Sequence, residues 1–225
     1  MVTLKKYHGL GNDYLIYDPN QNRELLQERQ IQLLCRRNTG VGADGILSGP
    51  VFENEKIKVR IFNPDGSEAE RSGNGIRIFS KYLKDAGYVK EKCYELWTKA
   101  GPVQVEFLDE DASHMKVDMG YAAFGADSIH AVGFEGDMIN ESVFFCDNFY
   151  NITCVSMGNP NCVVMMEEIS RKKALHLGPY VENSKYFQDR INMQLCHVVD
   201  RENIQIEIYE RGAGYTYASG TGAVS

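Results

Sequence analysis

At 225 residues the chain is long enough for one large domain or two small ones, each with its own core. A hydrophobic content of 43% and a charged content of 24% are those of an ordinary globular protein. The formal charge of −7 argues against nucleic acid or an anionic membrane as the main partner, and no stretch approaches the ~20 apolar residues of a membrane-spanning helix.

The first 120 residues alternate between strand and helix patterns. Short apolar or alternating runs predict strands at residues 3–7, 14–17, 45–48, 57–63, 93–98, 102–108 and 114–119. Leucines and isoleucines at helical spacing predict a helix over residues 24–37, and a second helix should begin after Ser72 and end at Gly87. Residues 120–140 contain many small residues without strong periodicity, so we place a domain boundary there, giving domains 1–120 and 121–225.

The second half restarts the pattern. Strands are predicted near residues 142–146, 151–157, 162–166, 194–199 and 204–210, with a helical stretch near 167–176. A further helix should begin after Ser219, six residues before the last residue given. If the halves are equivalent, the second domain lacks most of this helix, and we expect the sequence to be part of a longer protein.

A shift of 147 positions aligns residues 58–78 with residues 205–225 without a gap. Ser72 falls on Ser219, and Gly11-Asn12 falls on Gly158-Asn159. A repeated strand, loop and Ser-Gly-X-Gly helix start predicts two related α/β domains. Two such helix starts that face each other would form a symmetric anion-binding cleft with one reactive side chain on each wall.

Other site types find little support. The six cysteines form no CxxC pair, so buried apolar thiols are favoured over disulfides or zinc, and the five histidines have no ligand spacing. Residues 40–45 match GxGxxG, but a helix precedes them and a strand follows, the reverse of a dinucleotide fold. Neither serine lies in a G-x-S-x-G nucleophile elbow. Residues 1–14 lack the apolar core of a signal peptide, which predicts a cytoplasmic protein.

Six segments in order resemble the motifs of the diaminopimelate epimerase family. They read KYHGLGNDYLIYD, RRNTGVGADGIL, FNPDGSEAERSGNGIR, MGNPNCV, RIN and YERGAGYTYASGTGA, and run from residue 5 to the C-terminus. The resemblance implies an α+β fold of two pseudo-symmetric domains, each a β-structure wrapped around a central helix, with the active site in the cleft between them. It implies a cofactor-independent isomerase that interconverts LL- and meso-diaminopimelate, in lysine and cell-wall precursor biosynthesis, without pyridoxal phosphate or a metal.

Ser72 and Ser219 stand where the family has its two catalytic cysteines. The reaction needs a base on one face of the α-carbon and an acid on the other, and a thiol of pKa ~8.5 serves as both. A serine hydroxyl has no comparable acidity, so the chain should bind substrate without turning it over. Serine is also a preferred helix N-cap, a role compatible with that location. An exchange made to trap a ligand and a naturally silent homologue both remain open.

The remaining site residues follow from the resemblance. The α-carboxylate should lie on backbone N–H groups at Gly73, Asn74, Gly220 and Thr221. The family's asparagine ligands match Asn12, Asn63, Asn159 and Asn192. Arg211 would fork onto the distal carboxylate of the substrate, and Glu210 would engage an amine.

Several departures leave the substrate open. Asn161 replaces the family's histidine, which suggests a lost hydrogen bond or proton relay; Tyr215, Tyr217 and Pro64 also differ. A related racemase of another polar amino acid such as histidine is one alternative, and a non-catalytic amino-acid-binding homologue is another. The oligomeric state stays open, with a homodimer as one option.

Overall fold

Strand β2 (Asn12–Tyr17) shows how the sequence builds the first part of the molecule. Successive side chains of a strand point to opposite faces of the sheet. Tyr14 and Ile16 pack into one hydrophobic core, whereas Leu15 and Tyr17 pack into another on the opposite face. A strand buried on both faces explains why this run reads as nearly continuous apolar sequence.

The computed structural model describes residues 2–225 and contains two compact units, which divide between Gly120 and Tyr121. The first unit is an eight-stranded sheet in the order β1-β2-β3-β4-β6-β7-β8, with β5 paired to β4. Its strands are β1 (Lys5–Gly9), β2, β3 (Gly45–Glu53), β4 (Lys56–Phe62), β5 (Glu68–Ala69), β6 (Cys93–Thr98), β7 (Gly101–Phe107) and β8 (Met115–Val117). The two helices are α1 (Glu28–Cys35) and α2 (Gly73–Asp85).

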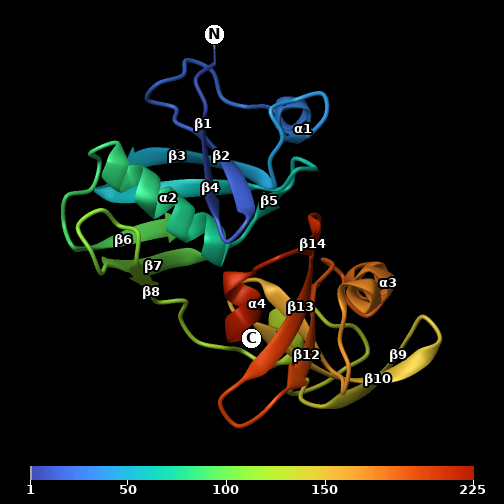
Figure 1. Ribbon diagram of the computed structural model, residues 1–225. Coiled ribbons are helices and arrows are strands. Elements are labelled where there is room, and N and C mark those ends of the chain that lie inside the picture. The colour runs from blue at the N-terminus through green and yellow to red at the C-terminus, as the bar shows by residue number, and fades with distance from the viewer. Residues whose placement is uncertain (1) are drawn as a thin grey trace. The chain divides into compact units, whose positions relative to one another are not determined.

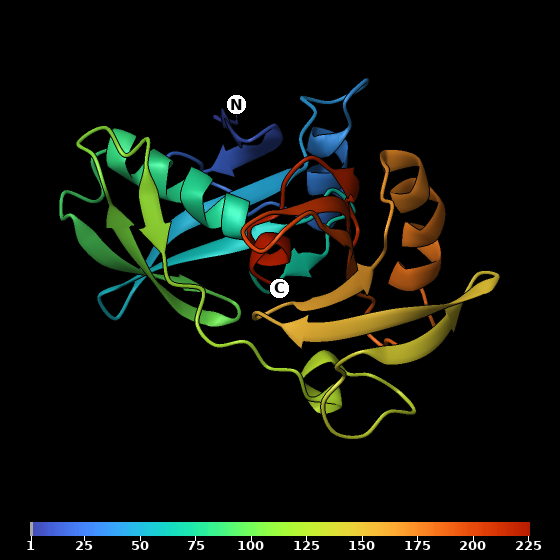
Figure 2. The same cartoon turned by 60° about the horizontal axis from the view of Figure 1, so that its bottom comes forward.

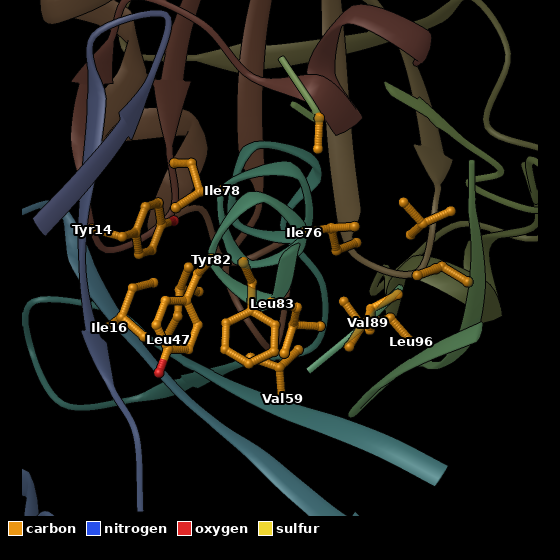
Figure 3. Packing of buried hydrophobic residues seen from close by; sticks show 14 of the residues in the cluster. Tyr14, Ile16, Leu47, Val59, Ile76, Ile78, Tyr82, Leu83, Val89 and Leu96 are labelled. Atoms are coloured by element: carbon orange, nitrogen blue, oxygen red, sulfur yellow. The ribbon is translucent and has the colours of Figure 1, made fainter. Parts of the chain in front are cut away.

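Helix α2 is the centre of the main core of the first unit. Figure 3 shows Ile76, Ile78 and Leu83 of this helix among side chains from β2, β3, β4 and β6. Phe79 and Leu83 have no exposed surface. Helix α1 packs on the other face of the sheet, where Ile31 and Cys35 meet Leu15 and Ile46.

The second unit is a six-stranded sheet in the order β14-β13-β12-β11-β10-β9. Its elements are η1 (Ala126–Ile129), β9 (Glu141–Phe145), β10 (Asn148–Ser156), β11 (Pro160–Met165), α3 (Arg171–Glu182), β12 (Asn192–Val198), β13 (Ile204–Glu210), β14 (Gly214–Thr216) and α4 (Gly220–Val224). Figures 1 and 2 show α3 and α4 on opposite sides of this sheet. Met193 and Leu195 of β12 face the core beneath α3, while Gln194 between them lies against α4.

The strand register repeats at the offset found in the sequence. The parallel pair β2–β3 matches Tyr14 with Gly45, and the parallel pair β11–β12 matches Asn161 with Asn192. The antiparallel neighbours continue the equivalence, since Ile46 opposes Phe62 and Met193 opposes Tyr209. Each pair of partners is displaced by the same 147 positions. The predicted fold of two similar, sheet-rich α+β domains is confirmed.

Most predicted elements lie within a few residues of the observed ones, but two helix bounds were wrong and three short elements were missed. The helix predicted over 24–37 covers only Glu28–Cys35, and the helical stretch predicted at 167–176 runs as Arg171–Glu182. The short strands β5 and β14 and the 3-10 turn η1 were not predicted, because two or three residues carry no detectable period. Among residues 2–225, no helix combines the length and apolar character that crossing a membrane requires.

Candidate functional site: two equivalent helix starts

The first half of the site is the N-terminus of α2. Ser72 has an extended backbone and its Oγ accepts a hydrogen bond from the Gly75 N–H at 3.1 Å. This is the N-cap expected from the sequence. Gly73 and Asn74 begin the helix and are buried, and their N–H groups belong to the first turn, which has no intrahelical acceptor.

Asn12 is held beside this helix start by its own amide. Asn74 Nδ2 donates to Asn12 Oδ1 at 3.3 Å, and Asn12 Nδ2 donates to Asp44 Oδ2 at 2.9 Å. The amide of Asn12 therefore has a defined orientation, with its oxygen toward α2. Arg77, one turn further along the helix, donates to Asn74 Oδ1 at 2.6 Å.

A charged cluster fixes Asp44 in turn. Arg37 bridges the carboxylates of Asp13 and Asp44, and Lys6 pairs with Asp13 at 2.8 Å. Burial by itself would raise the pKa of Asp13, but hydrogen bonds from Arg37 and Lys6 hold that pKa well below its ordinary value. Asp13 therefore stays ionised through the physiological range and keeps Arg37 in place.

The second half of the site is the N-terminus of α4, built in the same way. Ser219 Oγ accepts from the Gly222 N–H at 3.1 Å, and Asn159 Nδ2 donates to Thr221 Oγ1 at 3.2 Å. Under the 147-residue shift, Asn159 and Thr221 are the counterparts of Asn12 and Asn74. Both halves thus join an asparagine at the beginning of a strand to the second residue of a helix.

Packing explains the second glycine of each Ser-Gly-X-Gly motif. A Cβ on Gly75 would lie 3.2 Å from Leu47 Cδ2, and a Cβ on Gly222 would lie 2.7 Å from Gln194 Nε2. Leu47 and Gln194 are again counterparts in the repeat. Each helix therefore approaches the same strand position at a distance that only glycine permits without displacement of a neighbour.

Asn161, which stands where the family has a histidine, is hydrogen-bonded at both ends of its amide. Its Nδ2 donates to Asn159 O at 2.9 Å and to Asn159 Oδ1 at 3.2 Å, and its Oδ1 accepts from Gln194 Nε2 at 3.2 Å. Asn161 has no exposed surface and Gln194 is 1% exposed. A buried row of amides therefore supports Asn159.

The other predicted residues lie at strand ends and in turns. Asn63 Nδ2 donates to Ser67 Oγ at 3.0 Å within the turn after β4. Asn192 is buried, and its Oδ1 accepts from the Arg211 N–H at 2.9 Å, which fixes the start of the Glu210-Arg211 turn. Arg211 Nη1 donates to Asp189 O at 3.0 Å. The structure thus joins Asn192 to Arg211, whereas Asn63 is bonded within its own turn.

The sequence did not identify three residues that contact the site. Tyr14 Oη lies 3.4 Å from Ser72 Oγ, and Asp44 and Arg37 support Asn12 through the bonds above. Asp44 belongs to the GADG segment. Its position in the sequence does not predict its hydrogen bond with Asn12, which lies 32 residues earlier. Tyr14 reads in sequence as a core residue of a strand, and it is indeed buried.

Comparison with known sequences identifies relatives across nearly the whole chain. The sequence model of the family described as diaminopimelate epimerase matches residues 4–125 and 153–225. Diaminopimelate epimerase 2 of Nostoc is 43% identical over 96% of this chain and 76% of its own length. The diaminopimelate epimerase of Synechocystis is 37% identical over 99% of this chain and 80% of its own length.

Solved structures share the fold at much lower identity. A probable proline racemase from Agrobacterium radiobacter superposes with a TM-score of 0.66 at 12% identity, covering 98% of this chain and 74% of that protein. A hydroxyproline epimerase from Agrobacterium vitis gives a TM-score of 0.66 at 12% identity, covering 97% of this chain and 73% of that protein. These similarities concern the arrangement of strands and helices.

Proposed function

Since the chain belongs to the diaminopimelate epimerase family, we propose that its ligand is diaminopimelate and that its site is built for two-base proton transfer at one α-carbon. The reaction of this site interconverts the LL and meso forms by removing a proton from one face and returning one to the other. This chemistry serves the biosynthesis of lysine and of cell-wall precursors. In the form with Ser72 and Ser219, the protein binds this ligand and does not turn it over.

The observation that carries this proposal is the duplicated helix start. Each unit presents a serine N-cap, two leading N–H groups and an asparagine bonded to the second helical residue. A two-base reaction at a single carbon needs two such groups with the same local geometry, one for each face of the carbon.

The helix starts supply the electrostatics of the reaction. The N–H groups of Gly73, Asn74, Gly220 and Thr221 donate hydrogen bonds to the α-carboxylate, and the positive ends of the helix dipoles favour the charge that develops when the α-proton leaves. Asn12 and Asn159 flank these N–H groups and hydrogen-bond the ligand. Glu210 engages the distal amine and Arg211 the distal carboxylate.

The surroundings of the two serines explain the expected lack of turnover. Within its own unit, Ser72 Oγ bonds to the Gly75 N–H and lies near Tyr14 Oη, and Ser219 Oγ bonds to the Gly222 N–H and lies 3.3 Å from Thr221 Oγ1. None of these partners is an imidazole, a carboxylate or an amine that could take the serine proton. A hydroxyl without such a base is a poor proton acceptor at neutral pH.

Proton exchange at the substrate α-carbon tests the proposal. In deuterium oxide, the protein should bind diaminopimelate calorimetrically but incorporate no deuterium at the α-carbon. Ser72→Cys with Ser219→Cys should restore both exchange and inversion without an added cofactor, because each thiol can act as acid and base.

The single replacements provide the matched controls. One cysteine supports exchange on one face at most, because the opposite face lacks its acid. Inversion at full rate by the double-serine protein would contradict the assignment of Ser72 and Ser219, and absence of any diaminopimelate binding would contradict the ligand.

A further inference from the structure

A cavity of about 480 Å³ lies in the first unit, beside the middle of α2. Three segments line it: residues 7–10 around the end of β1; Arg77, Ile78 and Lys81 of α2; and Leu108 with residues 112–115, which lead into β8. Its floor is apolar, since Ile78 and Ala112 are buried and belong to the main core. The volume is within the range of about 300–1,000 Å³ that small-molecule sites occupy.

The charge of this lining is opposite to that of the protein. The chain carries 31 acidic and 24 basic residues, yet the lining contains Arg77, Lys81, His8 and His114 and no carboxylate. Two of these groups already have acidic partners outside the lining: Lys81 pairs with Asp85 at 2.7 Å, and His114 Nδ1 lies 2.6 Å from Asp109. Within residues 2–225, Arg77 is therefore the lining cation that has no carboxylate partner, and it makes this wall of the cavity positive.

The Arg77 guanidinium has more N–H donors than its hydrogen bond to Asn74 uses. Among residues 2–225, its hydrogen bond is the one to the neutral Asn74 oxygen, through Nη2. A guanidinium carries five N–H donors in a planar fork, and that fork matches a carboxylate in two parallel bonds. Beside it the exposed side chains of Leu10 and Leu108 stand on the rim, 68% and 57% exposed. Apolar groups so exposed around a cationic centre suit a ligand with an apolar chain.

We propose that this cavity binds a small carboxylate that bears an apolar chain, with the carboxylate on Arg77 and the chain over Ile78 and between Leu10 and Leu108. The site is separate from the residues assigned to diaminopimelate, and its binding requires no catalysis. The two sites are linked through Arg77, because the guanidinium that binds the carboxylate also donates a hydrogen bond to Asn74. Because the bond to Asn74 uses one Nη2 donor, Arg77 can bind a ligand carboxylate while that bond stays in place.

The test on the unaltered protein uses three probes of matched chain length and one short carboxylate. Calorimetry, or chemical shifts of the protein in solution, should show that hexanoate binds. 1-Hexanol and hexylamine should bind at least about tenfold more weakly, because a hydrogen bond to a charged group contributes enough free energy for a tenfold difference in Kd. Acetate should also bind at least about tenfold more weakly than hexanoate, because it lacks the chain that covers the apolar surface. Equal binding of hexanoate and hexylamine would overturn the charge assignment, and equal binding of hexanoate and acetate would overturn the apolar one.

Variants locate the probe in the cavity. Arg77→Gln should weaken hexanoate at least about tenfold, whereas Lys84→Gln, which removes the same charge from the same helix outside the cavity, should leave it unchanged. Circular dichroism shows whether Arg77→Gln is folded; if it is not, shifts of the Ile78 and Met115 methyl groups on hexanoate addition decide the location. Undiminished hexanoate binding by folded Arg77→Gln, or shifts confined to other residues, would contradict the proposal.

Discussion

At the scale of single residues, the site is organised by amides whose orientation is set by fixed charges. Asn12 is 4% exposed and could in principle present either end of its amide. Asp44, which is bonded to Arg37, accepts from Asn12 Nδ2 and leaves only the oxygen to face Asn74. In the second unit the same task falls to neutral groups, since Asn159 is held by Asn161 and Thr221.

Asp44→Ala should therefore weaken diaminopimelate binding by about tenfold, because the Asn12 amide loses the acceptor that fixes it. Asp44→Asn, which keeps an oxygen in place, should recover most of this loss. Calorimetric titration of both variants measures the effect.

A double replacement separates positioning from general destabilisation. In an Asn12→Ala background, Asp44→Ala should cause no further loss of affinity, because it acts through Asn12 alone. Losses that simply add in the double variant would show that Asp44 affects the site by another route.

Arg211 distinguishes the two amino-acid substrates that the sequence leaves open. Diaminopimelate has a distal carboxylate and histidine has none. Arg211→Ala should cost diaminopimelate binding about 2 kcal/mol, the low end for a charge pair that is only partly removed from water. Histidine affinity should be unchanged. Tight binding of histidine by the unaltered protein, with diaminopimelate ignored, would assign the chain to a histidine racemase instead.

At the scale of elements, the close contact between helix α3 and strand β13 explains why the end of α3 was predicted wrongly. The helical stretch was predicted over residues 167–176, and the pair Gly178-Pro179 that follows is typical of a helix end. The structure continues α3 to Glu182, with Pro179 inside it. Gly178 allows this, since a Cβ there would lie 2.3 Å from Cγ of the Tyr209 ring. Gly178 is in close contact with Tyr209, which lies 31 residues later in the chain. In the sequence alone, a glycine required by such a contact looks like the end of a helix.

Gly178→Ala should consequently destabilise the protein by about 1–3 kcal/mol, the usual cost of forcing extra volume into a packed contact. Gly125→Ala is the matched control. Nothing lies within 4 Å of its Cβ position and its φ is −60°, so alanine there should be neutral or slightly stabilising. Urea unfolding of both variants measures the difference. A Gly178→Ala protein as stable as the control would mean that α3 can move away from β13 at little cost.

At the scale of the whole molecule, the repeat is what the sequence predicted best. The 147-residue offset was visible in residues 58–78 and 205–225, and the strand register of both sheets follows it. The support of each site was not predictable in the same way. Asp44 reaches Asn12, and Gln194 reaches Asn161, only because parallel strands bring distant segments together. Periodicity identifies a strand and its faces but not its neighbour in the sheet.

The two units also differ in how they should respond to acid. In the first unit, Asp18 is buried and accepts from Tyr82 Oη at 2.5 Å and Tyr88 Oη at 2.7 Å. Burial would raise the pKa of Asp18, but these bonds lower it overall. A carboxyl with a lowered folded pKa stabilises the protein above its unfolded pKa of about 3.9, and that contribution is lost as the pH falls through the folded value. In the second unit the comparable lowered carboxyl, Asp200, lies in an exposed turn.

Hydrogen exchange measured from about pH 4 downward should therefore show β2 and α2 losing protection before β10 and β12, after correction for intrinsic exchange rates. Tyr82→Phe removes one donor to Asp18 and should move this loss to higher pH, with about 1.5–3 kcal/mol lost at neutral pH. Tyr94→Phe is the control, because the Tyr94 hydroxyl donates to the neutral Ser80 Oγ at 2.7 Å. It should lower stability without moving the acid transition. An equal shift in both variants would show that the Asp18 carboxylate is not what makes the first unit sensitive to acid.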